Sequence, residues 1–458
     1  MAQPRVIIVG AGPAGVRCAQ TLVAAGLHPT VIDENRRDGG QIYRRQPENF
    51  TRPYAQLYGT EAGRAEALHT SFDALRAQVD YRPEALAWNV FDKKLHVVRD
   101  EASSALPYDA LVICSGATDR LMPVKGWQLA GTYSLGAAQI ALKAQACAIG
   151  RRVVFMGTGP LLYLVAAQYI KAGAEVAAVL DTSPFARRIA ALPKLLARPG
   201  VLFKGLALVA RIRRAGVPVL AGVTPVEITG SPDDGVQGVV VRDAGGTTHR
   251  FECDAVAMGY HLRPETQLAD LARCAFRFDA ETRQWLPEVG EDGRTSTPGV
   301  YLAGDGARVL GADAAEIAGR LAALAVLKDF GLDASQDELQ RLRAEQAGME
   351  RFRQGLAQAF PWPVQQAAQL PDEAIVCRCE AITAGELRRV VCDMGAQEAN
   401  RAKALSRVGM GRCQGRYCGH AGAEVIAHAA GVPVDQVGRL RGQAPVKPLS
   451  MAVREAVE

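Results

Sequence analysis

The stretch that most constrains the fold is Arg5–Gly15, RVIIVGAGPAG, near the start of the chain. A short apolar, β-branched run leads into a glycine-rich turn and then an alanine-rich segment to Ala25, which predicts a strand, a tight turn and a helix. Three glycines, Gly10, Gly12 and Gly15, have the G-x-G-x-x-G spacing, which permits the turn, the approach of a pyrophosphate and close helix–strand packing. Phosphates would then lie at a helix N-terminus, where free N–H groups point at them.

An acidic residue follows the next strand. The predicted strand Pro29–Ile32 ends at Asp33, close to the separation of about 20 residues at which a ribose-binding acid is expected. A glycine motif alone also fits an ordinary β–α turn, and the acid makes a dinucleotide site the favoured interpretation. The loop Arg36–Gln41, which contains Gly39 and Gly40, is then flexible enough to wrap the outer part of a nucleotide.

The same pattern recurs about 150 residues later, as an internal repeat. The apolar strand Val153–Met156 leads into Gly157 and Gly159, and a later strand ends at Asp181. Leu162 replaces the third glycine, so helix and strand cannot approach as closely. We expect a second nucleotide here, NAD(P) or ADP/ATP; the alternative is a retained fold with an empty or altered pocket.

Composition excludes several classes of function. With 458 residues the chain has room for two or three domains, and a net charge of +5 from scattered basic residues does not support nucleic-acid binding. No apolar run approaches the ~18 residues of a membrane span, so we expect no membrane span and a cytoplasmic location. The basic and apolar stretch Pro184–Gly216 fits a membrane surface or, as the favoured interpretation, a solvated helix face.

Two further motifs make the pattern specific. A buried strand ends at Gly116, and the strand–turn Thr297–Asp305 precedes an alanine-rich helix, Ala314–Leu327. In this order the motifs resemble the two-dinucleotide-domain flavoproteins of the glutathione and thioredoxin reductase superfamily. The resemblance implies an α/β fold with two Rossmann-like domains, one inserted in the other. The FAD domain would comprise residues 1–120 and 261–330, and the inserted nucleotide-binding domain residues 121–260.

The resemblance also implies roles for single residues. Asp33 would bind the adenosine ribose of FAD and Asp305 the ribityl chain, although Asp305 could instead cap its own loop. The remaining residues implied for FAD are glycines and one glutamine, namely Gly10, Gly12, Gly15, Gly40, Gln41, Gly116 and Gly304. Disulfide reductases of this superfamily carry a redox cysteine pair, and residues 1–330 contain no C-x-x-C or C-x4-C pair. Disulfide reduction is therefore disfavoured.

A four-cysteine module follows a predicted helical linker over residues 331–372. Its members are Cys377, Cys379, Cys413 and Cys418. Two close pairs of thiolates far apart in sequence can hold two bridged irons, and structural zinc or uncoordinated thiols are the alternatives. Neighbouring basic residues and glycines favour an anionic [2Fe–2S] cluster: Arg378, Arg412, Arg416, Gly411, Gly415 and Gly419. We predict that the other six cysteines, Cys392 included, are buried.

The pattern around these cysteines resembles the bacterioferritin-associated-ferredoxin-like [2Fe–2S] domain, over residues 373–440, with a tail at 441–458. An FAD fold joined to this small α-rich module is similar to the α subunit of hetero-oligomeric bacterial amine dehydrogenases, which include opine oxidases, D-hydroxyproline dehydrogenases and hydrogen cyanide synthase. The resemblance implies electron transfer from a β subunit that oxidises the substrate at its own flavin. It also implies a further partner, a small ferredoxin-like γ subunit.

No catalytic base is predicted in this chain, because its seven histidines are scattered. Two alternative functions remain open at this point. One is a self-sufficient NAD(P)H-dependent reductase that uses Gly157, Gly159 and Asp181. The other is a non-catalytic assembly subunit whose nucleotides are structural.

Overall fold

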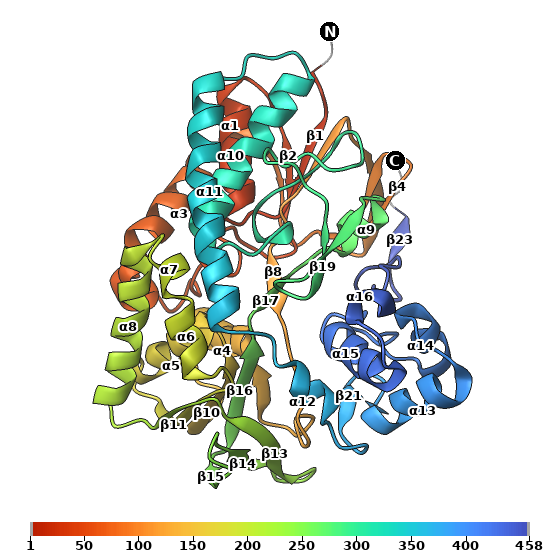
Figure 1. Cartoon of the computed structure of the whole chain (residues 1–458). Coiled ribbons are helices and arrows are strands. Elements are labelled where there is room, and N and C mark those ends of the chain that lie inside the picture. The colour runs from red at the N-terminus through yellow and green to blue at the C-terminus, as the bar shows by residue number, and fades with distance from the viewer. Residues whose placement is uncertain (1–2, 456–458) are drawn as a thin grey trace.

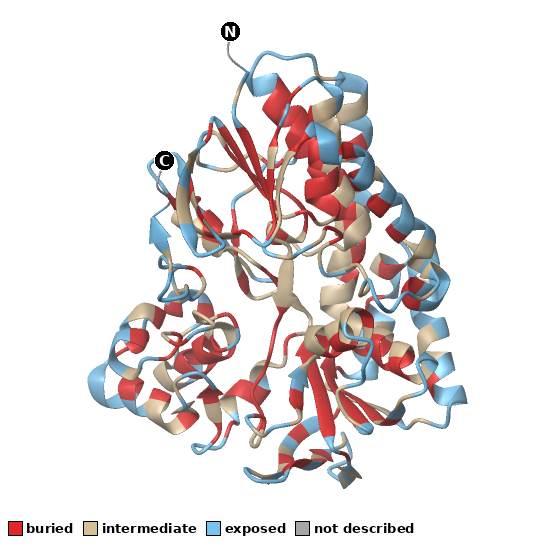
Figure 2. Cartoon of the chain, turned by 180° about the vertical axis from the view of Figure 1, so that it is seen from behind, coloured by how far each residue is buried: buried red, intermediate tan, exposed pale blue. Residues whose placement is uncertain are grey.

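The computed structural model describes residues 3–455, and its first sheet is built around the glycine-rich stretch. The strand order is β20-β7-β1-β2-β3, and every pair is parallel. The strands are β1 (Val6–Val9), β2 (Thr30–Ile32), β3 (Asp80–Arg82), β7 (Ala110–Ile113) and β20 (Val300–Leu302). The apolar runs of β1 and β7 are buried along their whole length, as expected for a parallel sheet covered on both faces (Figures 1 and 2).

Two long helices pack together beside this sheet. They are α1 (Pro13–Ala24) and α10 (Ala312–Asp329), with α3 (Ala62–Leu75) against α1. A Cβ atom at Gly319 would lie 2.0 Å from the Ala14 carbonyl oxygen, so only glycine permits this close crossing. The crossing brings the helix of the chain's first βαβ unit against a helix that follows β20, about 300 positions later, as the resemblance implied.

The second sheet lies entirely between β7 and β20 in the sequence. Its order is β12-β11-β10-β16-β9, again with parallel pairs. The strands are β9 (Thr132–Ser134), β10 (Arg152–Thr158), β11 (Glu175–Asp181), β12 (Val219–Ala221) and β16 (Ala255–Tyr260). The helices are α4 (Leu135–Ala144), α5 (Pro160–Lys171), α6 (Phe185–Ala190), α7 (Leu192–Leu195) and α8 (Pro199–Arg214). The predicted α/β class with two Rossmann-like units is confirmed.

A pair of short antiparallel strands, β8 (Ala117–Asp119) and β17 (Leu262–Pro264), connects the two sheets (Figure 1). The alternation of apolar and polar residues over 88–98 predicts a β-hairpin, which is confirmed as β4 (Leu86–Phe91) and β5 (Lys94–Arg99) and continues to β6 (Ala102–Pro107). The remaining antiparallel strands are β13 (Thr224–Ser231), β14 (Gly235–Arg242), β15 (Thr248–Glu252), β18 (Phe276–Asp279) and β19 (Gln284–Pro287). Short helices are α2 (Tyr54–Tyr58), α9 (Gln267–Leu271), η1 (Gly59–Glu61), η2 (Arg76–Gln78) and η3 (Gly304–Gly306).

The sequence pattern of residues 249–258 predicts a single strand, and this prediction is wrong. The segment breaks at Cys253 and Asp254, so that β15 pairs antiparallel with β14 whereas β16 enters the parallel sheet. The Asp254 carboxylate accepts hydrogen bonds from the backbone N–H groups of Arg151 and Arg152 at 2.9 Å, which fixes the chain at the change of sheet.

The C-terminal part begins with the long helix α11 (Gln336–Ala359) within the predicted linker. A small α-rich unit follows: α12 (Val364–Ala368), β21 (Ile375–Cys377), β22 (Ile382–Thr383), α13 (Ala384–Met394), α14 (Ala399–Ser406), α15 (Gly419–Ala430) and α16 (Val434–Val437). It shares a hydrophobic core with the inserted unit. The Trp127 indole N–H donates to the Ile375 carbonyl at 2.6 Å across this contact.

The tail returns to the first unit, where β23 (Arg454–Glu455) pairs with β6. Among the six isolated cysteines, four are buried as predicted, and the prediction is wrong for Cys147 and Cys392, which are exposed. Cys392 lies on the outer face of α13, whose Val390 and Val391 point into the core, and Cys147 lies in the loop after α4. Among the described residues, no helix is both long and apolar enough to cross a membrane.

Candidate cofactor cavity and cysteine site

One large cavity, of about 1470 Å³, runs along the carboxyl ends of the first sheet and extends to helices of the inserted unit. Ligands bind at this edge in open α/β folds. Most of the predicted FAD residues line it: Gly10, Gly12, Asp33, Gly40, Gln41, Gly116 and Asp305. Gly15 and Gly304 do not line the cavity but permit close packing. A Cβ atom at Gly15 would lie 1.8 Å from the Gly10 carbonyl oxygen, and a Cβ atom at Gly304 would lie 2.8 Å from the Ala14 Cβ.

The first glycine loop requires its glycines. Gly10 has φ +103°, and a Cβ atom there would lie 2.4 Å from the Cys114 carbonyl oxygen. At Gly40, with φ +61°, a Cβ atom would approach the Gly12 Cα to 3.0 Å. The loop of Gly40 therefore lies directly on the first glycine loop, which leaves bare backbone at the start of α1, where a pyrophosphate can approach.

Asp33 lies at the end of β2, nearly buried, beside this loop. Its Oδ2 accepts a hydrogen bond from the Ala11 N–H at 2.6 Å, and its Oδ1 accepts from the backbone and side-chain N–H groups of Asn35 at 2.7 and 2.8 Å. Burial raises the pKa of Asp33. A carboxylate offers about four acceptor positions, so these three bonds leave one for a hydroxyl of a nucleotide ribose.

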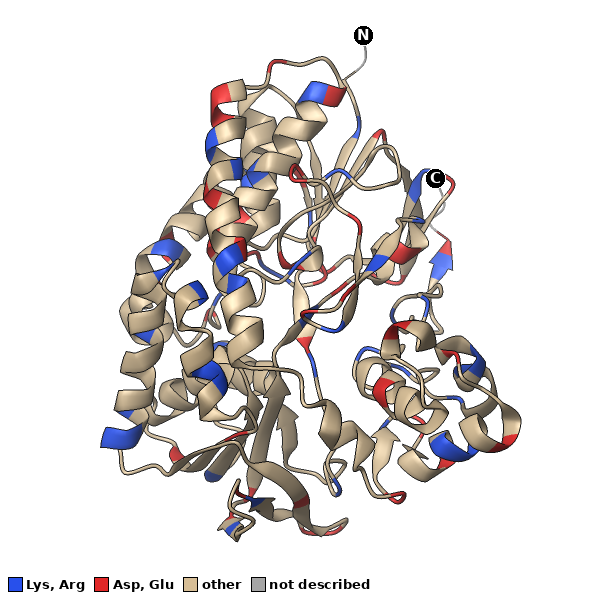
Figure 3. Cartoon of the chain, viewed as in Figure 1, with Lys and Arg blue, Asp and Glu red and all other residues tan. Residues whose placement is uncertain are grey.

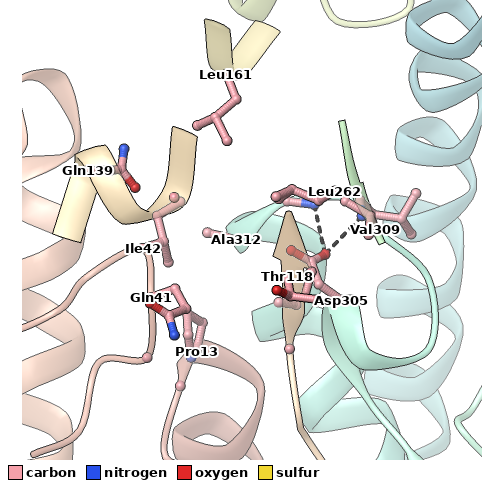
Figure 4. Close-up of a pocket in the computed structure, with 18 of the residues that line it drawn as sticks. Pro13, Gln41, Ile42, Thr118, Gln139, Leu161, Leu262, Asp305, Val309 and Ala312 are labelled. Atoms are coloured by element: carbon pink, nitrogen blue, oxygen red, sulfur yellow. Dashed lines mark hydrogen bonds between the residues drawn. The ribbon is translucent and has the colours of Figure 1, made fainter. Parts of the chain in front are cut away.

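Asp305 both lines the cavity and caps its loop. Its Oδ1 accepts hydrogen bonds from the backbone N–H groups of Leu310 and Gly311 at 2.9 and 3.1 Å, just before α10 (Figure 4). Burial raises the pKa of this carboxyl group. Figure 4 shows Asp305 across the cavity from Gln41 and Pro13, beside Thr118 of β8. The two interpretations of Asp305 are therefore compatible.

Lys143 is a cavity residue that the sequence reasoning missed. It comes from α4 of the inserted unit, is 5% exposed, and its Nζ donates to the Ile42 carbonyl oxygen at 3.2 Å. Burial lowers its pKa to about 8. An ammonium group has three donors, so Lys143 can also bind an acceptor in the cavity.

The second glycine loop is covered by its own chain. The three predicted residues Gly157, Gly159 and Asp181 do not line the cavity, although the neighbouring Pro160 and Leu161 do. A Cβ atom at Gly159 would lie 3.2 Å from the His261 ring. The Nε2 atom of His261 in turn lies 2.5 Å from the carbonyl oxygen of Phe360, at the end of α11. His261 and Phe360 thus lie over the loop.

Asp181 is completely buried and fully hydrogen-bonded. Its Oδ1 accepts from the Thr158 hydroxyl at 3.0 Å and from the N–H and hydroxyl of Ser183, both at 2.7 Å. Its Oδ2 accepts from the Tyr163 hydroxyl at 2.7 Å and from the Arg188 guanidinium at 2.6 Å. These five bonds use the whole acceptor capacity of a carboxylate. In this structure Asp181 has no acceptor position left for a ribose.

The four predicted cysteines come together at the edge of the small C-terminal unit. Interaction with the Cys418 thiol, with help from backbone N–H groups, lowers the pKa of Cys377 to about 6 and that of Cys413 to about 5. Cys413 also faces Cys379. The same hydrogen bonds with Cys377 and Cys413 raise the pKa of Cys418, and burial raises that of Cys379. The four thiols therefore lie within reach of one another, and since thiolates are the form that binds metals, the donor set fits a thiolate-bound cluster. Within residues 3–455 no group of three or more His, Cys, Asp or Glu side chains is arranged to hold a single metal ion.

Glycines and one leucine shape the loop that carries Cys413. A Cβ atom at Gly411 would lie 2.2 Å from Cys379 Cβ, so a side chain there would push the two cysteine segments apart. Gly409 and Gly415, both with positive φ, pack against the Leu440 side chain, which a Cβ atom would meet at 2.5 and 2.7 Å. Cys418 lies at the N-terminus of α15, whose positive end favours negative charge.

The basic residues near these cysteines have roles that the sequence did not indicate. Arg416 is nearly buried and binds Glu265, just after β17, through Nε at 2.8 Å. The guanidinium groups of Arg263 and Arg416 lower the pKa of Glu265 against the opposing effect of burial. Arg378 instead lies over the Trp127 ring, 5.2 Å from its centre. About 150 residues separate Arg416 from Glu265, so no local pattern could have paired them.

The cysteine loop forms part of the wall of the large cavity. Arg416 and Tyr417, between the last two cysteines, line the same cavity as the first glycine loop. The Gln267 amide also donates to the Gln414 carbonyl oxygen at 2.7 Å. The two predicted sites are therefore adjacent parts of one continuous structure.

Comparison with known proteins agrees with this arrangement. Residues 4–324 match the family described as pyridine nucleotide-disulphide oxidoreductase, and residues 375–428 match the BFD-like [2Fe-2S] binding domain. The chain is 38% identical to an opine oxidase subunit from Rhizobium meliloti, over 98% of this chain and 86% of that protein. It is 30% identical to the hydrogen cyanide synthase subunit HcnB of Pseudomonas aeruginosa, over 97% of each.

Among solved structures, L-proline dehydrogenase from P. horikoshii has the same fold. The TM-score is 0.70 at 21% identity, and the match covers 98% of this chain and 79% of that chain. The two family matches identify FAD and a [2Fe–2S] cluster as the cofactors of a chain of this kind.

Proposed function

We propose that this chain, which belongs to the pyridine nucleotide-disulphide oxidoreductase family and carries a BFD-like [2Fe-2S] domain, is the electron-transferring subunit of an amine or amino-acid dehydrogenase of the opine or D-hydroxyproline class. It is a flavin and [2Fe–2S] oxidoreductase subunit, as the full-length matches to subunits of opine oxidase and hydrogen cyanide synthase support. The substrate class and the partner with its own flavin are the proposed part.

The observation that carries this proposal is the contact between the cysteine loop and the cavity. Arg416 and Tyr417 line the cavity and stand directly beside Cys418. Bound FAD exchanges two electrons and a [2Fe–2S] cluster one at a time, so this pair of groups converts two-electron chemistry into single-electron flow. Residues 1–330 contain no redox cysteine pair that would offer another exit.

The residues have distinct roles in this proposal. Gly10, Gly12 and Gly40 expose backbone for the pyrophosphate of FAD, and Asp33 offers its free acceptor position to the ribose. Asp305 holds the loop before α10 and faces the cavity. The cluster ligands are the side chains of Cys377, Cys379, Cys413 and Cys418, which would bind iron as thiolates.

The structure gives less support to the NAD(P)H-dependent alternative. In dinucleotide folds an acid after the second strand binds the ribose hydroxyls, and Asp181 has all its acceptor positions filled by Thr158, Ser183, Tyr163 and Arg188. A hydride donor bound in the usual manner would have to break this network. A partner subunit that supplies the electrons needs no such rearrangement.

Purification of the chain alone and in its native complex tests the proposal. We expect the isolated chain to contain FAD and the cluster but to leave opines, D-hydroxyproline and other amino acids unoxidised, and the complex to oxidise one of them. In the complex, Cys413→Ser should abolish the EPR signal of the reduced cluster and slow electron delivery to a dye. Amino-acid oxidation by the isolated chain, or rapid bleaching of its flavin by NADH, would overturn the proposal. Cofactors that substrate cannot reduce in the complete complex would favour the assembly subunit.

A further inference from the structure

The helices α6, α7 and α8 form an unusual surface on the inserted unit. Residues 182–226 contain no Asp or Glu. The same stretch contains eight basic residues: Arg187, Arg188, Lys194, Arg198, Lys204, Arg211, Arg213 and Arg214. Figure 3 shows Lys and Arg along these helices, at the side of the molecule opposite the small C-terminal unit. Four of them are paired with acids of other elements, namely Arg188 with Asp181, Lys194 with Glu281, Arg198 with Asp313 and Lys204 with Glu61. The other four leave a net positive charge that is complementary to an acidic partner.

The same surface exposes large apolar side chains. Seven lie within 22 residues and are 38–65% exposed: Phe185, Ile189, Leu192, Leu196, Val201, Phe203 and Leu206. We call these residues the α6–α8 apolar face. The inner sides of the helices pack on α5 and α11 through buried residues such as Leu195 and Ile212 (Figure 2). Seven exposed large apolar side chains in so short a stretch are more than a solvated helix face requires, and concentrations of this kind commonly mark interaction sites.

The apolar face adjoins the cofactor cavity. Val201 belongs to both, and the cavity is also lined by Arg198, just before α8, and by Lys204 and Arg211 of α8. Arg198 and Lys204 are held by Asp313 at the start of α10 and by Glu61, at 3.0 Å each, which fixes α8 against the first unit. A molecule bound to the face therefore covers one end of the cavity.

Four outer basic residues of the surface have no acidic partner in the described part of the chain. Among residues 3–455, Arg187, Arg211, Arg213 and Arg214 form no salt bridge. Arg187 lies on α6 and the other three lie in the last turn of α8, so they belong to the helices that carry the apolar face. Protein interfaces commonly combine an apolar centre with a charged rim. The complementary surface has an apolar centre and a rim of carboxylates.

We propose that the α6–α8 apolar face is the docking surface for the substrate-oxidising subunit of the complex, whose binding closes this end of the cavity. The inference rests on the proposed function, which requires such a subunit. A redox partner must approach the cavity in order to exchange electrons with its cofactor, and this face is the apolar surface that borders the cavity. A bilayer would match the charge and the apolar groups but would bring no electron donor.

The test compares two phenylalanines of equal exposure. Phe203 in the face is 65% exposed and Phe91 at the end of β4 is 66% exposed, and neither lines the cavity. The holoenzyme is reconstituted from this chain, as wild type, Phe203→Glu or Phe91→Glu, and the purified substrate-oxidising subunit. We expect Phe203→Glu to raise the Kd between subunits at least tenfold, and Phe91→Glu to leave it within twofold. Flavin and cluster spectra, and the Tm of the isolated chain, should be unchanged in both. Leu206→Glu serves as the second variant if Phe203→Glu fails to fold.

The possible outcomes separate the hypotheses. Wild-type affinity in Phe203→Glu and Leu206→Glu would overturn the docking surface but leave the proposed function intact. Failure of any substrate-oxidising subunit to bind the wild-type chain would overturn the proposed function itself. Loss of binding to phosphatidylglycerol vesicles, with the affinity between subunits retained, would assign the face to a membrane. Loss of a self-dimer, with the same affinity retained, would assign it to a second copy. Either result would refute the proposal.

Discussion

Replacement of Asp181 by asparagine tests whether the second glycine loop is closed by its own chain. The substitution keeps the volume of the side chain but turns one oxygen into an NH₂ group. Whichever way the amide is oriented, this group faces a donor that cannot reverse, the Ser183 N–H on one side or the Arg188 guanidinium on the other. Arg188, with 19% of its side chain exposed, also loses its carboxylate. Loss of one partner of a buried pair costs about 3–5 kcal/mol.

Hydrogen exchange of the amides in β10 and β11 measures this loss, because a chain with several units does not unfold in one step. Under conditions where reclosing is fast, a loss of about 3–5 kcal/mol accelerates exchange about 10²- to 10⁴-fold. Glu175→Gln, at the other end of β11, is the control, because its ion pair with Arg152 lies on the surface and contributes at most about 1 kcal/mol. Exchange within threefold of wild type in Asp181→Asn, together with weaker binding of NADH or ATP, would refute the network and restore Asp181 as a ribose ligand.

Three further predictions concern the cavity and the cysteine loop. Gly411→Ala should displace Cys379 and lower the iron content by more than half, whereas Gly348→Ala, with open space around it, should keep full iron content. The pKa of Lys143 is about 8 in the folded state and about 10.5 in the unfolded state, so the unfolded state binds more protons between these pH values. The free energy of unfolding of the apoprotein should therefore rise by about 3 kcal/mol as the pH rises through this range. Chemical denaturation of Lys143→Met should show no such rise. Glu265→Gln should lower the Tm at pH 7, because it removes the negative charge that Arg263 and Arg416 stabilise. The difference in Tm between variant and wild type should vanish as the pH falls through the lowered pKa of Glu265, because the wild-type side chain is then neutral as well.

Features decided by neighbouring residues could be predicted from the sequence. The glycine loops, the strands that precede them and the gathering of four cysteines follow from turn geometry and ligand spacing. The broken strand at Cys253 could not be predicted, because no glycine or proline marks the break, and the change of sheet depends on how Asp254 binds the backbone of Arg151 and Arg152.

Contacts between segments that lie far apart in the sequence could not be predicted either. Arg416 was expected to balance the charge of the cluster, but its guanidinium binds Glu265 and joins the cysteine loop to the cavity wall. The α6–α8 segment was expected to be a solvated helix face. Its composition indicated an amphipathic surface, but only packing on α5 and α11 decides which apolar side chains stay outside.

The two glycine loops explain why one motif can have two outcomes in a single chain. Val16 and Tyr163 occupy the same position, six residues after the first glycine of each loop. Valine cannot reach the acid, so Asp33 keeps an acceptor position beside the cavity, whereas the Tyr163 hydroxyl binds Asp181 and helps Arg188 to fill it. The glycine spacing therefore predicts the βαβ fold in both places, and a single side chain on the following helix helps to decide whether the acid is free. Tyr163→Val alone should leave Asp181 bound by Arg188 and Ser183, so we expect opening of the second loop only when Arg188 is replaced as well.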